Sequence, residues 1–364
     1  MKNHDTGLTR RFLASRVVTA LAEPHGVDRY LNLVNPLWSV RDVRARVVAI
    51  ARRTPDTVTM TLRPNGLWAG ARAGQYVRFG VDIDGVRRIR CFSLAGSAAG
   101  AGPLEITAKV NPAGTVTRWL ATRARPGLLV HLSQAEGEFT LPDQVGPHVL
   151  LISGGSGITP TMSIARTLRD VRYPGRVTIL HYARTPDDVV YRAELARLAR
   201  TCPRFTVTYR YTGSKRNGHF RAQHLRAITP DYADAHAFVC GPAGLLDAVS
   251  RHWAAEGISD RLRIERFTVA GAPFLGDPGT VAGELWFSRS GIRVPGDGRT
   301  LLEQAEAAGL RPAFGCRMGI CHTCGSHKPE GPVRDVRTGV ISAEPDEQVR
   351  LCVNTPAGDV EIAI

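Results

Sequence analysis

Three cysteines within nine residues carry the strongest chemical signal in this chain. Cys316, Cys321 and Cys324 form the spacing C-x4-C-x2-C, and Cys352 follows near the C-terminus. Two sulfide-bridged irons need four thiolates, three of which can come from one loop while the fourth approaches from another side. Gly319 in this loop would let backbone N–H groups turn toward the sulfurs. The spacing therefore predicts a 2Fe–2S cluster with these four cysteines as its ligands.

Other metal sites fit these residues less well. A Rieske centre needs C-x-H as well as C-x2-H, and only the second pattern occurs, ending at His327. Haem attachment needs His directly after C-x2-C, where Gly325 stands instead. A zinc site that uses His327 is the alternative, although its spacing does not match the usual ligand pairs.

The residues around the cysteines indicate a small separate domain. Residues 284–310 read as strand, turn, strand and then a helix from about Thr300, with Glu303 at the capping-box position. The chain closes on the alternating strand "GDVEIAI". Residues 283–364 resemble plant-type ferredoxins, which implies an α+β (β-grasp) 2Fe–2S domain. The residues before it must therefore serve another purpose.

Residues 41–142 have the pattern of a β domain. Strand-length runs alternate with Gly, Pro and Asp turns, and Asp84-Gly85 is a hairpin signal. Six such strands over this length predict a small closed barrel.

Within these strands, "RCFS" resembles the R-x-Y-S motif of ferredoxin-NADP reductase-like flavoproteins. That resemblance implies that Arg90 contacts the flavin phosphate, Phe92 packs along the isoalloxazine, and Ser93 lies near N5. Phe92 replaces the usual Tyr, so stacking is kept and the phenol hydrogen bond is lost. An ordinary strand that contains an Arg is the alternative for this motif alone.

Two further segments resemble the same family in the expected order. "AGQYV" matches the segment before the flavin strand, and "AKVNPAGTVTRWL" matches the pyrophosphate loop with its helix, whose first N–H groups would face an anion. The resemblance implies FAD, because this loop suits a diphosphate, with FMN as the alternative. The flavin-binding residues implied here are Gln75, Tyr76, Lys109, Gly114, Val116 and Thr117.

Residues 143–268 alternate apolar strands with helices, which predicts a nucleotide-binding α/β domain with a parallel sheet. "GGSGITP" follows the first strand and opens a helix, where glycines let the backbone close on a diphosphate. Thr159 is expected to cap this helix, and Pro160 suits its first turn. A tight strand–helix turn without a ligand is the alternative. The residues predicted to hold the coenzyme here are Gly154, Gly155, Ser156, Gly157, Ile158 and Thr159.

The last apolar strand ends in Cys240-Gly241-Pro242. In ferredoxin reductase-like enzymes this motif places the Cys beside the nicotinamide, so Ser93 and Cys240 are the expected catalytic pair. Arg184 ends the second strand, where a 2′-phosphate would sit, and favours NADPH over NADH. Phe267 either shields the flavin or is a core aromatic.

The order of the parts indicates a chain of electron carriers. Nicotinamide gives two electrons as hydride and a 2Fe–2S cluster takes one, whereas flavin can accept two and release them singly. From about residue 41 onward the chain resembles ferredoxin reductase-like oxidoreductases with a C-terminal 2Fe–2S domain. Its N-terminal stretch is similar to reductases that supply membrane-bound acyl-lipid (stearoyl-CoA) desaturases. A Rieske-type or cytochrome P450 hydroxylase is the alternative acceptor, and a redox sensor without turnover is the non-enzyme alternative.

Composition narrows the location and the partners. The net charge of +14 suits an acidic partner or an anionic membrane surface, and no run or motif typical of nucleic-acid binding accompanies it. No apolar stretch reaches the roughly 18 residues of a spanning helix. Arg10-Arg11 resembles an export signal, but the apolar run 17–22 that follows is too short for one. Residues 1–40 are therefore expected to form a helical segment. The protein is expected to be cytoplasmic, with peripheral contact at the inner face of the membrane as an option. Residues 269–282 read as a linker.

Overall fold

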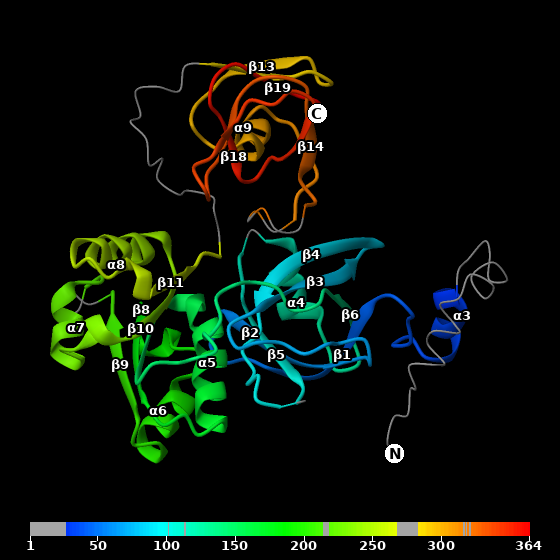
Figure 1. Ribbon diagram of the computed structural model, residues 1–364. Coiled ribbons are helices and arrows are strands. Elements are labelled where there is room, and N and C mark those ends of the chain that lie inside the picture. The colour runs from blue at the N-terminus through cyan, green and yellow to red at the C-terminus, as the bar shows by residue number, and fades with distance from the viewer. Residues whose placement is uncertain are drawn as a thin grey trace. The chain divides into compact units, whose positions relative to one another are not determined.

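The computed structural model describes residues 27–100, 102–112, 114–213, 218–267, 283–315, 317, 319 and 322–364. The chain forms two compact units, Met1–Glu265 and Arg266–Ile364 (Figure 1). Residues 1–26 of the predicted N-terminal segment and the predicted linker, 269–282, lie outside the described residues.

An antiparallel barrel begins the first unit. It follows helix α3 (Val27–Val34), and its strands pair in the order β4-β3-β6-β1-β2-β5. An antiparallel bridge between Leu94 and Ile106 joins the two ends of this order and closes the barrel, as the strand pattern predicted. The strands are β1 (Val43–Ala51), β2 (Thr57–Pro64), β3 (Tyr76–Ile83), β4 (Val86–Ser93), β5 (Leu104–Lys109) and β6 (Leu129–Leu132).

Two local features shape this barrel. Asp84 and Gly85 both have positive φ angles, 50° and 76°, and form the predicted two-residue turn between β3 and β4. Helix α4 (Thr115–Arg123) places Val116 and Leu120 in the barrel core, where both are 1% exposed. The helix thereby fixes the loop that precedes it against the barrel.

A five-stranded parallel sheet completes the first unit, in the order β11-β10-β7-β8-β9. Figure 1 shows α5 and α6 on one side of this sheet and α7 and α8 on the other. The order reverses between β7 and β10, which creates a crevice at their carboxyl ends. The strands are β7 (His148–Gly154), β8 (Arg176–Ala183), β9 (Phe205–Tyr211), β10 (His236–Cys240) and β11 (Leu262–Glu265), and the helices are α5 (Ile158–Asp170), α6 (Arg192–Thr201), α7 (Ala222–Ile228) and α8 (Ala243–Ala255).

The second unit contains three small sheets and one helix, α9 (Leu301–Ala307), within its described part. The predicted capping box is present, because Glu303 N donates to Thr300 Oγ1 at 3.3 Å and Thr300 N donates to Glu303 Oε2 at 3.1 Å. The strands are β12 (Glu284–Phe287), β13 (Ile292–Pro295), β14 (Gly325–Lys328), β15 (Val333–Asp335), β16 (Ile341–Ser342), β17 (Glu347–Arg350), β18 (Asn354–Pro356) and β19 (Val360–Ile362).

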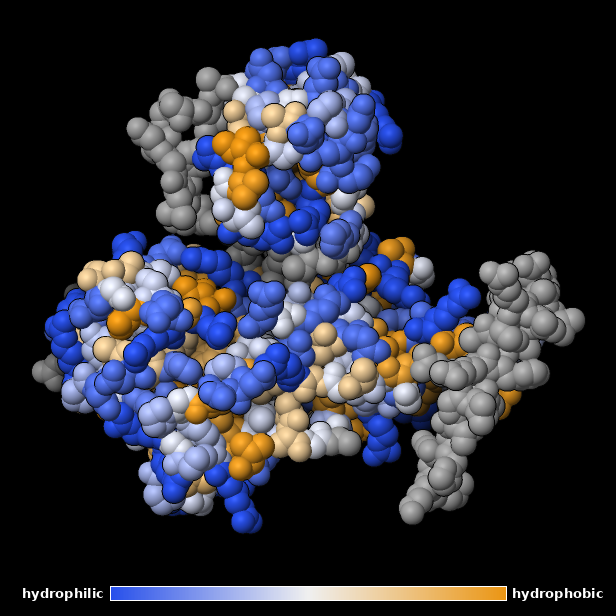
Figure 2. Space-filling view, viewed as in Figure 1, coloured by the Kyte–Doolittle hydropathy of each residue, from blue (hydrophilic) through white to orange (hydrophobic). Residues whose placement is uncertain are grey.

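Polar residues cover most of the visible surface of each unit, with apolar side chains in separate small areas (Figure 2). Within the described residues, every helix is too short or too polar to cross a bilayer.

We expect Thr300→Ala to destabilise the second unit by about 1 kcal/mol, because the first turn of α9 loses its cap. Thr300→Ser keeps the hydroxyl and should leave stability nearly unchanged. Calorimetric unfolding of the full-length variants measures the difference. Equal unfolding temperatures for the Ala and Ser variants would contradict the capping role.

Candidate functional site

The two glycine-bearing motifs of the parallel sheet pack directly on each other. A Cβ on Gly157 would lie 2.1 Å from the carbonyl oxygen of Cys240, and one on Gly241 would lie 3.0 Å from the backbone nitrogen of Gly154. The first distance excludes any side chain and the second is tighter than most real Cβ contacts, so glycine is required at 157 and favoured at 241, beside the carboxyl ends of the paired strands β7 and β10. The fold therefore brings the predicted "GGSG" turn and the Cys240-Gly241-Pro242 turn to one place.

The turn after β7 leaves a helix start without a side-chain cap. Gly155 has a φ of +54°, Gly157 is the N-cap of α5, and no side chain accepts from its first N–H groups. The prediction that Thr159 caps this helix is wrong. The helix begins one residue before Thr159, whose hydroxyl donates to the carbonyl oxygen of Ser156 at 3.0 Å. Pro160 lies in the first turn as predicted. The Ile158 N–H donates to the carbonyl oxygens of Gly155 and Ser156, so a diphosphate would be bound by N–H groups of the turn before it.

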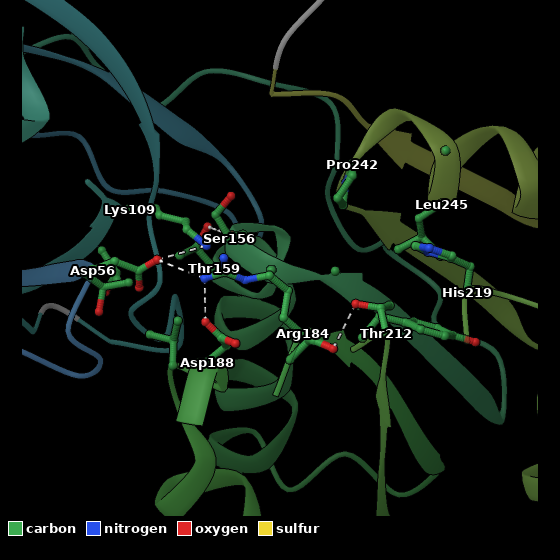
Figure 3. Close-up of a pocket in the computed structure, with 18 of the residues that line it drawn as sticks. Asp56, Lys109, Ser156, Thr159, Arg184, Asp188, Thr212, His219, Pro242 and Leu245 are labelled. Carbon is green, nitrogen blue, oxygen red and sulfur yellow. Dashed lines mark hydrogen bonds and ion pairs between the residues drawn. The ribbon is translucent and has the colours of Figure 1, made fainter. Parts of the chain in front are cut away.

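A cavity of about 520 Å³ opens at this edge of the sheet. Figure 3 shows Asp56, Lys109 and Asp188 on one side of it and Pro242, Leu245 and His219 on the other. Barrel residues and parallel-sheet residues share its wall, so a ligand here would contact both. The lining residues include Asp56, Thr57, Thr107, Lys109, Gly154, Gly155, Ser156, Thr159, Arg184, Asp188, Thr212 and Pro242.

Charged side chains in this cavity form a chain of ion pairs across the two domains. Arg184 Nη2 lies 2.7 Å from Asp188 Oδ1 and 3.7 Å from Asp56 Oδ2, and Lys109 Nζ lies 3.1 Å from the same Asp56 oxygen. Burial opposes ionisation of Asp56, but hydrogen bonds from Thr54 and Lys109 outweigh it and lower the pKa of that carboxyl. Lys109, expected to hold flavin, thus lines the cavity beside Arg184.

Three buried polar groups lie at the ends of β4, β10 and β11. Ser93 Oγ and Glu265 Oε2 have no hydrogen-bond partner among the described residues. Cys240 is fully buried and is the register partner of Glu265. Burial is the main cause that raises the pKa of its thiol, and the Glu265 carboxyl adds to the effect. Buried polar atoms without partners are costly, and a bound group with complementary atoms removes that cost. Ser93 and Cys240 therefore fit the predicted flavin and nicotinamide chemistry.

The sequence-based prediction missed Glu265. Burial raises the pKa of its carboxyl to about 8, so the group is largely neutral at pH 7. Its only signal in the sequence was an acidic residue within the segment "IERF", in which apolar and charged residues are mixed. Pairing of β10 with β11 was needed to place it beside Cys240.

The predicted flavin residues of the barrel occupy neighbouring strands. Tyr76 opens β3 opposite Ser93, and Phe92 contacts Phe79 edge-on at 5.6 Å between ring centroids. Arg90 is half-buried on the same strand. The Gln75 amide accepts from the backbone of residue 72 at 2.8 Å and donates to that of residue 137 at 3.2 Å, so it shapes the loop. These flavin contacts stay predictions.

The predicted pyrophosphate loop also begins a helix without a side-chain cap. Gly114 is the N-cap of α4, and the Thr117 hydroxyl accepts from Asn111 N at 3.0 Å. Val116 turns its side chain into the core, so only its backbone can serve a ligand. Phe267 belongs to the second unit, and its predicted flavin contact stays a prediction.

Two of the four predicted cluster ligands lie in the described part of the second unit. Cys324 and Cys352 are 2% and 3% exposed, and Cys316 and Cys321 fall outside the described residues. Gly319 N donates to Cys352 Sγ at 3.3 Å, which confirms the predicted N–H to sulfur contact. Gly319 has a φ of +72°, and a Cβ there would lie 2.7 Å from Val353. This compact thiolate environment fits a 2Fe–2S cluster.

Two guanidinium groups converge on the same loop. Arg350 Nη1 donates to the carbonyl oxygen of Gly319 at 2.5 Å, and Arg337 Nη1 reaches that oxygen at 3.5 Å. Asp335 orients Arg337 through a 3.0 Å bond to its Nε. These contacts hold the backbone that donates to Cys352 and place positive charge beside the thiolates.

Three features together define a nicotinamide-dependent electron-transfer oxidoreductase. They are the closed barrel, the parallel sheet with its two packed glycine turns, and the unit that holds the buried cysteines. Residues 151–251 match the family "Oxidoreductase NAD-binding domain", and residues 288–356 match "2Fe-2S iron-sulfur cluster binding domain". The chain is 38% identical to the NADPH oxidoreductase of Mycobacterium tuberculosis over 97% of its own length and 92% of the relative's. It belongs to the ferredoxin reductase-like oxidoreductases with a C-terminal 2Fe–2S domain.

Other relatives and solved structures agree with this family. The glycine betaine monooxygenase reductase subunit of Pseudomonas aeruginosa is 28% identical, covering 91% of this chain and 99% of the relative. Phthalate dioxygenase reductase shares the fold with a TM-score of 0.61 at 20% identity, covering 89% of this chain and 98% of that one. The flavohem-like FAD/NAD binding domain of Vibrio cholerae nitric oxide dioxygenase has a TM-score of 0.55 at 26% identity, covering 62% and 99%.

We expect Glu265→Gln to change how stability depends on pH. The folded-state pKa, about 8, lies above the ordinary 4.5, so the carboxyl's contribution is fully present below pH 4.5 and is lost as the pH rises through 8. Between pH 6 and 9 the wild type should lose about 2–3 kcal/mol relative to the variant, which cannot titrate. Thermal unfolding of the full-length proteins across this range measures it, and parallel curves would contradict the burial of Glu265.

We expect Arg350→Met to lower the reduction potential of the cluster by on the order of tens of millivolts, since a positive charge near the thiolates is removed. Arg350→Lys should recover part of the shift. Potentiometric titration followed by paramagnetic resonance gives the potential, and iron content controls for cluster loss. An unchanged potential in a fully loaded Met variant would show that Arg350 acts on the loop backbone alone.

Proposed function

We propose that this oxidoreductase takes electrons from NADPH, passes them through FAD and its 2Fe–2S cluster, and delivers them to a partner oxygenase. The supporting observation is the packing of the two glycine turns on each other. Gly154, Gly155 and Ser156 of one turn and Pro242 of the other line a cavity that barrel residues also line. Bound flavin would accept the hydride pair and release single electrons. Ser93, Cys240 and Glu265 are the residues that would meet the reacting rings.

Arg184 and the curated relative support NADPH as the coenzyme. Arg184 lines the cavity at the carboxyl end of β8, and the Mycobacterium tuberculosis relative is named an NADPH oxidoreductase. Asp188 and Asp56 pair with the guanidinium, so a 2′-phosphate would replace carboxylate contacts that are partly solvent-screened. The uncapped start of α4 supports a diphosphate, and hence FAD over FMN.

The names of several relatives favour a hydroxylating oxygenase as the electron acceptor. They include reductase subunits of glycine betaine monooxygenase and of a stachydrine N-demethylase, and a similar structure is a cytochrome P450 reductase from Amycolatopsis. The N-terminal resemblance to desaturase reductases makes a membrane-bound desaturase the second candidate. These relatives lend it no support, and they fit the Rieske or P450 alternative better.

The distribution of charge bears on how an acceptor would dock. Residues 283–364 hold nine Lys and Arg against eleven Asp and Glu, so the positive excess lies in residues 1–282. The unit that must approach the acceptor is therefore slightly acidic. The net charge of +14 gives no reason to expect an acidic acceptor at the cluster.

Anaerobic mixing of the purified full chain with NADPH tests the proposed function. We expect flavin bleaching followed by loss of cluster absorbance, and Arg184→Ala should raise the half-saturating NADPH concentration several-fold while leaving that for NADH nearly unchanged. An unchanged spectrum with either coenzyme would leave only the redox-sensor alternative. Adding a Rieske oxygenase, a P450 or desaturase-containing vesicles then compares reoxidation rates of the cluster.

A further inference from the structure

One polar face of α5 forms hydrogen bonds with the barrel segment that follows Ser93. Ser163 Oγ donates to the carbonyl oxygen of Gly96 at 2.7 Å, and Thr167 Oγ1 accepts from Ala98 N at 2.9 Å. Between them, Arg166 Nη1 donates to the carbonyl oxygen of Ala95 at 2.8 Å. These three helix residues are spaced i, i+3, i+4 and therefore share one face.

Arg166 is the centre of this contact. Its guanidinium binds both oxygens of Glu194, with Nε to Oε1 at 2.8 Å and Nη2 to Oε2 at 2.6 Å, and its Nη1 also donates to Glu105 Oε1 at 2.7 Å. Glu105 belongs to barrel strand β5, whereas Glu194 belongs to α6. The Arg166 side chain is only 10% exposed and lies 5.0 Å from the ring centroid of Tyr191.

The surrounding residues complete the network on the barrel side. Tyr191 shares a 2.7 Å hydrogen bond with Thr107, a barrel residue that lines the cavity of about 520 Å³. Arg53 lies 3.7 Å from Glu105 and Arg169 lies 3.9 Å from Glu194, so three guanidinium groups surround the two carboxylates. The buried charges are thus paired, and the bidentate geometry restricts how the domains can rotate against each other.

The hydrogen bond between Arg166 and Ala95 lies close, along the chain, to both predicted cofactor sites. Ala95 lies two residues after Ser93, and Arg166 lies seven residues after Thr159, about 10 Å along α5. One hydrogen bond to Arg166 therefore connects the strand end predicted to face flavin with the helix whose start is predicted to face the coenzyme. Hydride transfer requires the two rings to be held within about 3–3.5 Å, and small misplacements cost large factors in rate.

We propose that the Ser163–Arg166–Thr167 face of α5 sets the relative position of flavin and nicotinamide, with Arg166 as a positioning residue for hydride transfer. The inference rests on the proposed function. Arg166 touches neither ring, and it acts through Ala95 and Glu105 on one side and through α5 on the other.

The test uses the full-length flavin- and cluster-loaded protein in anaerobic stopped-flow mixing with NADPH, after the wild type has been shown to be reduced. Arg166→Lys keeps the charge but cannot bind Glu194 and the barrel together, and Ser163→Ala with Thr167→Val removes the flanking bonds. Arg200→Lys is the matched control, because it makes the same change at an exposed arginine in the last turn of α6.

We expect both the Arg166 variant and the double variant to slow flavin reduction at saturating NADPH about tenfold or more, with a weaker charge-transfer band and a changed isotope effect with C4-deuterated NADPH. The half-saturating NADPH concentration, flavin content and dithionite reduction of the cluster should stay near wild type, as should every value for Arg200→Lys. The proposal would be overturned if both variants reduced flavin as fast as the wild type. It would also be overturned if their rates fell only in proportion to a fall in unfolding temperature. Failure of the wild type to be reduced would instead reject the proposed function.

Discussion

The contact of glycine backbone with glycine backbone at the ends of β7 and β10 is the constraint on which the coenzyme site depends. Gly157 lies so close to Cys240 that a methyl group would overlap the carbonyl oxygen. Because of this contact, an uncapped helix start and a buried thiol share one edge of the sheet. The strand order alone would create a crevice there, but the glycines decide how closely a dinucleotide can approach its floor.

Around that contact the protein keeps polar groups buried at a cost. Ser93 and Glu265 have unpartnered oxygen atoms among the described residues, and burial keeps the Glu265 carboxyl largely neutral at pH 7. Such groups destabilise a protein unless a bound partner satisfies them. Ser93 and Glu265 end strands β4 and β11, and the ion pairs of Arg166 are buried as well.

Local patterns predicted much of this molecule correctly. The Thr300 capping box, the Asp84-Gly85 turn and the alternation of strands with helices depend on residues a few positions apart, and the structure has all three. Thr159 was predicted wrongly because the turn after β7 continues as a short 3₁₀ helix, which moves the cap to Gly157. No local signal distinguishes those two starts.

The sequence by itself determined the class of chemistry, because four cysteines at fixed spacing and two glycine turns after strands limit the possible cofactors. Only the tertiary structure decided which side chains support that chemistry. Glu265 reaches Cys240 through parallel strand pairing, and Asp56 reaches Arg184 across two domains. Burial and long-range ion pairing depend on surfaces that distant segments create when they pack, so no short window of sequence contains them.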